Sequence, residues 1–153
     1  MIVAIISVII LAVILGLRQG GQIKKLSQNP NDREALIKLF NSCDAPYTYR
    51  DAAKCGIKYL EGNPEDFEIM KLTAWAFFQN KSGGDIKELL ENRIKNLENI
   101  VNDPQKFDSF TKKDKGFKLY AQNLFMYYAS ALLAFKENEL SKYYEQKANS
   151  LKK

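Results

Sequence analysis

The chain has 153 residues, of which 46% are hydrophobic, and its 23 basic and 18 acidic residues give a formal charge of +5. This length allows one modest core, so a single folded domain is expected. No histidine is present, which excludes the usual general base near neutral pH and the commonest transition-metal ligand. Basic and acidic residues are interspersed, and no basic run alternates with aromatic residues, so we expect no nucleic-acid partner.

The first 17 residues, MIVAIISVIILAVILGL, form an uncharged apolar run. As a helix this run is roughly 26 Å long, close to the thickness of a bilayer core. We expect an uncleaved transmembrane anchor over residues 1–17, because a basic n-region and a small-residue cleavage site are missing. Two alternatives stay open, an atypical signal peptide and the packed N-terminal helix of a pilin-like protein. Pilin-like mature proteins resemble one another in a glutamate at the fifth position, where this chain has Ile5.

Residues 18–31 are expected to be a juxtamembrane linker, because Gly20 and Gly21 favour a flexible connection. Arg18, Lys24 and Lys25 follow the apolar run closely. The positive-inside rule therefore predicts a single-pass membrane protein whose C-terminal domain lies in the cytoplasm. An organelle membrane with the domain facing the cytosol is a further interpretation.

Residues 32–153 show helical periodicity throughout, and no strand is predicted. Helices are expected over 32–43, from a cap at Thr48 to Gly62, from Asn63 to the turn at 80–84, and over 86–101, 115–135 and 139–151. The lysine-rich stretch 107–115 is expected to be a looser connection. The fold class is therefore all-α, with about three antiparallel helix pairs that each need a neighbour to bury their apolar faces.

A short motif recurs in this helical region. The stretch NPNDREAL begins at residue 29, and NPEDFEIM begins 34 residues later, at residue 63. This spacing is the period of the tetratricopeptide repeat, which the region 32–153 resembles in a degenerate form. Small and bulky residues stand at the expected places in the first unit (Leu36, Leu39, Ala52) and in the last (Phe125, Tyr128, Ala129, Ser141, Ala148).

Three features depart from the repeat pattern. Phe40 stands where the family has a small residue, and Gly56 stands where it usually has an aromatic residue. The second unit is also stretched, to 40 residues between Pro64 and Pro104. A generic helical bundle is the alternative that these departures leave open.

The resemblance implies a protein-binding scaffold whose groove is lined by the first helix of each pair. Trp75 is the strongest candidate, because it lies beside the core stripe of its helix and can anchor a partner, although a place at the edge of the core is equally compatible. Lys38 and Asn41 are candidates for contacts to a partner carboxylate or backbone. The groove positions carried over from the family are Glu34, Ile37, Asn41 and Asp44 in the first unit and Lys71, Trp75 and Phe78 in the second.

The predicted function is a membrane-anchored scaffold or adaptor for a protein partner. The alternative is a permanent accessory subunit of a larger membrane complex, such as a secretion, motility or respiratory assembly. We expect no enzyme, no cofactor and no metal: Cys43 and Cys55 occupy apolar positions and are expected to be buried free thiols. An enzyme using carboxylates or a thiol is a third alternative. The acidic residues at helical spacing are instead expected to form local ion pairs (Asp85, Glu88, Glu91 and Glu98 with Lys87, Arg93 and Lys95).

Overall fold

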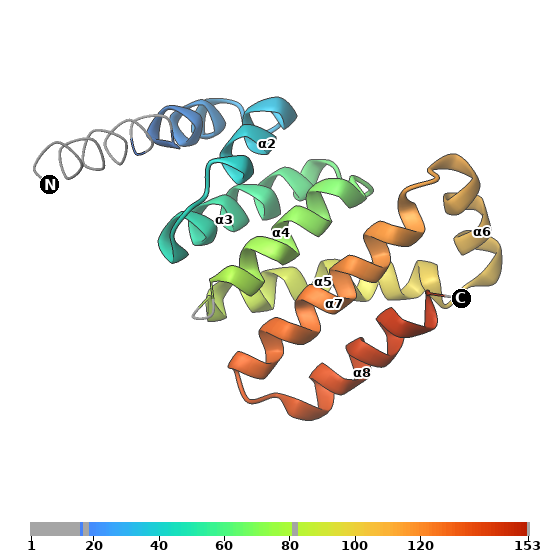
Figure 1. Ribbon diagram of the computed structural model, residues 1–153. Coiled ribbons are helices and arrows are strands. Elements are labelled where there is room, and N and C mark those ends of the chain that lie inside the picture. The colour runs from blue at the N-terminus through green and yellow to red at the C-terminus, as the bar shows by residue number, and fades with distance from the viewer. Residues whose placement is uncertain (1–15, 17–18, 81–82, 153) are drawn as a thin grey trace, which may run out of the picture.

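The computed structural model describes residues 16, 19–80 and 83–152, and every regular element in this part of the chain is a helix (Figure 1). A helical segment over residues 19–28 comes first. Seven helices follow: α2 (Arg33–Asn41), α3 (Pro46–Gly62), α4 (Phe67–Gln79), α5 (Gly84–Val101), α6 (Pro104–Lys113), α7 (Phe117–Ala134) and α8 (Asn138–Ser150).

The predicted transmembrane architecture is corrected by the structure. Within residues 16, 19–80 and 83–152, no helix is long and apolar enough to cross a membrane. The more apolar of the two 18-residue helices, α7, carries Lys118, Gln122 and Asn123 and buries Leu124 and Tyr128 inside the domain. The predicted anchor, residues 1–17, lies outside the described residues except for Gly16. The predictions of a transmembrane helix, of a single-pass membrane protein and of a membrane location are therefore not upheld.

The segment expected to be a flexible linker is helical over residues 19–28. Leu26 is 4% exposed and Ile23 packs against the same core, so the spacing of three residues gives this short helix an apolar face. The side-chain amide of Gln19 donates to the carbonyl of Ser42. Lys24 and Lys25 are exposed on this helix and flank no span in the described part of the chain, and Arg18 lies outside it. The predicted placement of the C-terminal domain in the cytoplasm depended on these three residues flanking a membrane span, so it is not upheld either.

The repeated motif supplies the N-terminal caps of two helices. The carboxylate of Asp32 accepts from the backbone N–H of Ala35 (2.9 Å) at the start of α2, and the carboxylate of Asp66 accepts from the N–H of Ile69 (3.2 Å) at the start of α4. The two copies also touch, because the amide of Asn63 donates to the side-chain oxygen of Asn31 (3.2 Å). Equivalent loops of the first two hairpins therefore lie side by side.

The start of α3 differs from the prediction by three residues. Its cap residue is Ala45 and Pro46 is the first helical residue, where a proline loses no helical hydrogen bond. Thr48, expected to be the cap itself, lies in the first turn, and its hydroxyl accepts from the backbone N–H groups of Asp44 (3.2 Å) and Ala45 (3.1 Å). The threonine thus still satisfies donors at this helix end.

Helices α3, α4, α7 and α8 lie side by side, and α5 passes behind α4 and α7 (Figure 1). The most extensive packing is between α7 and α8, between α4 and α7, and between α3 and α4. Where α7 meets α8, the hydroxyl of Ser141 donates to the carbonyl of Ala129 (2.7 Å), and both residues are buried. Small side chains at these two positions allow the helices to approach closely.

Helix α6 was not predicted from the sequence, which was interpreted as a loose connection over residues 107–115. Its Phe107 and Phe110 face the fully buried Phe117 of α7, with ring centroids 5.7 and 5.3 Å away. Asp103 caps it by accepting from the N–H groups of Gln105 and Lys106, both at 3.1 Å. An extra helix therefore separates the second predicted pair, α4 and α5, from the third, α7 and α8.

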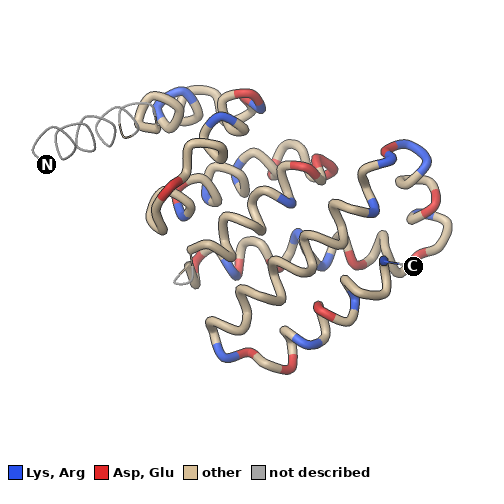
Figure 2. Tube along the Cα trace, in the orientation of Figure 1, with Lys and Arg blue, Asp and Glu red and all other residues tan. Residues whose placement is uncertain are grey.

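Charged residues are spread over most helices but are sparse on α4 and α7 (Figure 2). Arg33 of α2 joins the starts of α2 and α4 through ion pairs with Asp66 (2.7 Å) and Glu68 (2.5 Å). A second set of contacts joins α5 to α8, where Glu98 accepts from Lys147 (2.9 Å) and Tyr143 (2.6 Å). These contacts between helices fix the arrangement that shapes the site below.

Candidate functional site

A pocket of about 340 Å³ lies where α2, α4 and α7 meet. We call it the Trp75 pocket. Three of the sequence-predicted groove residues line it, namely Asn41 from the end of α2 and Lys71 and Trp75 from α4. The other lining residues are Phe40, Cys43, Leu72 and Tyr127. The pocket is thus formed by the first helices of the three predicted pairs.

Trp75 is partly buried at the wall of this pocket. Its ring meets the ring of Tyr49 on α3 edge to face, with centroids 5.0 Å apart and an interplanar angle of 90°. Such aromatic pairs hold a ring in a defined orientation and add to the burial of its apolar area. Trp75 therefore presents a fixed apolar surface, which is what a partner side chain needs for an anchored contact.

Lys71 supplies the positive charge of the Trp75 pocket. Its ammonium lies 5.0 Å from the ring centroid of Tyr120 on α7. It takes part in no ion pair with any residue that the structure describes. The aromatic face holds the cation without neutralising it. Lys71 thus remains able to pair with an acidic group or to donate to a carbonyl of a partner.

The remaining predicted groove residues lie around this pocket and not inside it. Phe78 stacks on Tyr127, with centroids 6.3 Å apart and an angle of 10° between the rings, so it supports a pocket wall from behind. Ile37 is partly buried against the core and lines neither of the two pockets on α2. Glu34 pairs with Lys38 (2.5 Å), which raises the pKa of Lys38. Asp44 is exposed beyond the end of α2.

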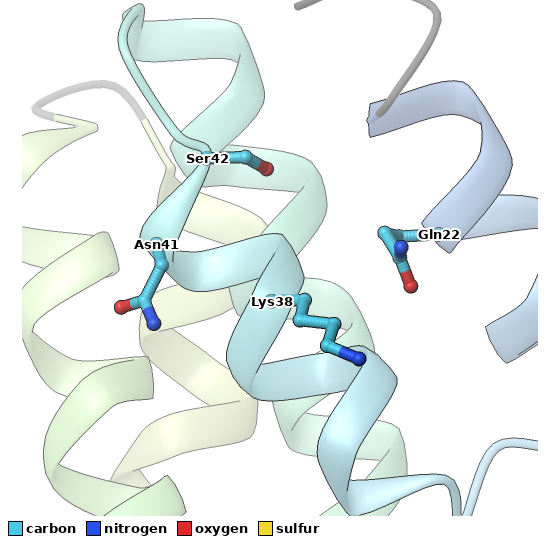
Figure 3. Close-up of a pocket in the computed structure, with 4 residues that line it drawn as sticks. All are labelled: Gln22, Lys38, Asn41 and Ser42. Atoms are coloured by element: carbon cyan, nitrogen blue, oxygen red, sulfur yellow. The ribbon is translucent and has the colours of Figure 1, made fainter.

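A second, polar pocket of about 370 Å³ adjoins the first (Figure 3). It is lined by Lys38, Asn41 and Ser42 on one side and by Gln22 of the helical segment on the other. Asn41 lines both pockets and so connects them. The side-chain oxygen of Gln22 is buried and accepts no hydrogen bond from the described groups. Together the two pockets form a surface with apolar, amide and cationic parts.

The two cysteines do not have the environment of nucleophiles. Burial raises the pKa of Cys43 to about 11, against a smaller lowering effect of its hydrogen bond to Thr48. Burial also raises the pKa of Cys55. Both are free thiols, as predicted, but each is only partly buried. At neutral pH the thiol form dominates at both positions, whereas catalysis requires the thiolate.

Three of the four acidic residues predicted to form ion pairs do so, mostly with other partners than predicted, whereas Glu88 pairs with no residue that the structure describes. Asp85 pairs with Arg50 (3.0 Å) and Lys54 (2.9 Å) of α3, and these two contacts lower its pKa to about 2. Glu91 pairs with Lys95 (3.0 Å), as expected from their spacing. In residues 16, 19–80 and 83–152, no group of three acidic or cysteine residues could hold a metal ion.

The sequence analysis selected none of Tyr127, Gln22 and Ser42 as groove residues. Tyr127 sits on the face of α7 that meets α4, and the apolar run of α7 gave no signal that separates this face from the core. Gln22 lies in a segment that was expected to be flexible. Its place in the polar pocket depends on the docking of residues 19–28, which no local pattern predicted.

No protein-family model, no curated protein and no solved structure matches the chain. The resemblance to tetratricopeptide repeats therefore stays a prediction. The assignment of the site depends on the geometry of the two pockets alone.

Proposed function

We propose that this domain is a protein-binding scaffold that takes up an extended segment of a partner across the Trp75 pocket and the polar pocket. The proposal depends on one observation above all: Asn41 of α2 and Lys71 and Trp75 of α4, selected from two different repeat units, line one pocket. A pocket with one exposed aromatic face, one amide and one cation provides an anchor and orienting contacts, which is typical of recognition sites for peptides.

The amides of Asn41 and Gln22 suit the main chain of such a segment. Each can donate and accept at once, as the peptide groups of an extended chain require. The ring of Trp75 then takes an apolar side chain of the partner. This pattern selects partners by an apolar residue near an acidic or uncharged stretch, because Lys71 and Lys38 disfavour basic partners.

The test is selection from a library of displayed peptides against the full chain, followed by measurement of dissociation constants for the selected peptides by calorimetry. Trp75→Ala should raise the dissociation constants of these peptides at least tenfold, as expected for a central aromatic anchor. Lys71→Met should weaken acidic peptides and leave uncharged ones nearly unchanged. The matched control is Tyr47→Ala, because Tyr47 is 71% exposed on α3 and lines neither pocket.

Equal losses in Trp75→Ala and Tyr47→Ala would refute the site, provided that circular dichroism shows both variants folded. Unchanged affinities in both variants would place the bound peptides elsewhere on the domain. Either result would remove Trp75 from the proposed site.

A permanent subunit of a larger assembly is a second candidate, favoured by an apolar stripe on α7. Leu119 and Leu133 are 56% and 57% exposed, and Met126 lies midway between them at intervals of seven residues. This spacing places all three on one side of the helix, as in helices that pack permanently against a partner helix. Replacing Leu119 and Leu133 with glutamine should dissociate such an assembly without affecting peptides held by Trp75.

A further inference from the structure

A third hollow lies on the other side of the helical segment 19–28, where this segment packs on α3. Its volume is about 220 Å³, and we call it the Cys55 cavity. Ile23, Leu26 and Pro30 form its apolar wall, and Cys55 faces them from α3. It shares no lining residue with the Trp75 pocket or the polar pocket. A ligand bound here would therefore leave the proposed peptide site free.

The charged residues of this cavity are all positive. Lys54 and Lys58 line it one helical turn apart, and no acidic residue does. Lys54 pairs with Asp85 (2.9 Å), which it shares with Arg50 (3.0 Å), whereas Lys58 has no ion-pair partner among the described residues. Burial raises the pKa of the Cys55 thiol, and the nearby charge of Lys58 opposes that shift. Asp51 acts on the thiol with the opposite sign but is not part of the wall.

An apolar hollow beside one uncompensated cation is complementary to a molecule with a short apolar tail and one negative charge. Cavities of this size accept apolar molecules: an engineered apolar cavity of about 150 Å³ binds benzene. If a methylene group takes about the volume of a water molecule, about 30 Å³, the cavity holds about seven of them. The volume thus limits the chain length of the ligand, and the charge selects its head group.

We propose that the Cys55 cavity is a binding site for a free medium-chain carboxylate of about six to eight carbons. The carboxylate pairs with the ammonium of Lys58, and the alkyl chain lies between Ile23 and Leu26 of the helical segment and α3. Because the ligand bridges the helical segment and α3, it also fastens residues 19–28 to the domain.

The cysteine in the wall allows a direct test on the full chain. The rate of alkylation of Cys55 by iodoacetamide is measured by peptide mass spectrometry while octanoate is titrated below its micellar concentration. Cys43 lies in the Trp75 pocket and provides an internal reference in the same molecule. Octanoate should slow the labelling of Cys55 and leave that of Cys43 unchanged. The concentration of carboxylate that halves the labelling rate of Cys55 should fall about fourfold for each added methylene from butanoate to octanoate. It should fall no further at decanoate.

Three variants separate the head-group contact from the fit of the tail. Lys58→Ala should weaken the binding of octanoate about fivefold and leave the binding of octanol unchanged. Lys115→Ala should change the binding of neither ligand. Lys115 is exposed between α6 and α7 and far from the cavity in sequence and fold, so it controls for net charge. Ser27→Trp should abolish protection, because Ser27 is an exposed residue at the cavity and a large side chain there fills it.

Several results would overturn the proposal. Equal protection of both cysteines would indicate a general effect of the amphiphile on the fold. Potency that keeps rising through dodecanoate would exclude a cavity of limited size. Protection that grows with protein concentration in the absence of octanoate would assign the cavity to contact with a second copy, and absence of protection at millimolar octanoate would exclude the site.

Discussion

Gly56 of α3 lies tightly against Thr73 of α4, and its replacement by alanine gives a sharp test of the packing. A Cβ atom at this position would lie 2.2 Å from the Oγ1 of Thr73 and 3.0 Å from the Cζ of Phe40. Thr73 is fully buried, and its hydroxyl donates to the carbonyl of Ile69 (2.8 Å). The hydroxyl therefore cannot turn away from the new methyl group without losing its hydrogen bond.

Two opposing effects set the magnitude. Alanine in the interior of a helix is favoured over glycine by about 1 kcal/mol. Overpacking a close-packed site costs about 1–3 kcal/mol, and an unsatisfied buried hydroxyl costs about 1–3 kcal/mol more. We expect Gly56→Ala to lower the free energy of unfolding by about 2 kcal/mol. For a chain of this size the thermal midpoint should fall by roughly 6 °C.

The assay is urea and thermal unfolding followed by circular dichroism at 222 nm. Gly84→Ala is the matched control, because the nearest atom to its new Cβ, in Phe135, is at an ordinary contact distance of 3.9 Å. The clash can be isolated by repeating Gly56→Ala in a Thr73→Ala background, where the substitution should become neutral or stabilising. A Gly56→Ala protein as stable as the parent, or an unchanged effect in the Thr73→Ala background, would refute this account of the α3–α4 contact.

Three further outcomes are expected. Asp32→Ala should lower the free energy of unfolding by about 1 kcal/mol, because it removes a helix cap. Asp66→Ala should lower it by about 2–3 kcal/mol, because Asp66 caps α4, accepts from the hydroxyl of Tyr59 (3.0 Å) and pairs with an arginine of α2. Equal losses in urea unfolding would contradict this difference. Burial tends to raise the pKa of Glu98, but the lysine and the two tyrosine hydroxyls of α8 outweigh it and lower that pKa. The stability that ionised Glu98 contributes is therefore fully present above the ordinary carboxyl pKa and is lost as the pH falls through the lowered value. At pH 7 the parent protein should have a free energy of unfolding about 2 kcal/mol higher than Glu98→Gln, and this difference should disappear in acid. A constant difference between pH 7 and pH 3 would be inconsistent with that contact. With its pKa at about 11, Cys43 should be alkylated about tenfold faster for each pH unit between 7 and 10, and a plateau near pH 8 would show that burial does not control this thiol.

Helix positions were largely predictable from the sequence, because α5 and α8 carry clear apolar stripes, whereas α4 and α7 are long apolar runs bounded by turn residues. The misses have local reasons. The sequence analysis ended a helix at residue 101 and expected no helix directly after it. Asp103 followed by Pro104 is nevertheless a typical helix start, and in the structure Asp103 caps α6. Residues 19–28 contain two adjacent glycines, which favour a turn, yet the burial of Leu26 outweighs that preference.

The candidate site was partly predictable for a different reason. Asn41, Lys71 and Trp75 were selected by their positions in the repeat, and the spacing within each helix fixed which way they face. What spacing within a helix could not give is the distance between helices. The contribution of Tyr127 depends on how α7 lies against α4, and that arrangement is set by packing between residues distant in sequence.

The two departures from the repeat pattern in the first unit are one compensating pair. Phe40 has a large side chain where the repeat has a small one, and Gly56 has no side chain where the repeat usually has an aromatic ring. In the structure the ring of Phe40 reaches to 3.0 Å from where a Gly56 Cβ would lie, so the ring shares with the side chain of Thr73 the volume that the glycine leaves. Replacing either residue alone creates a cavity or a clash, which is why neither departure is interpretable by itself. Phe40 also lines the Trp75 pocket, so this exchange of volume in the core determines the wall against which a partner of Trp75 would pack.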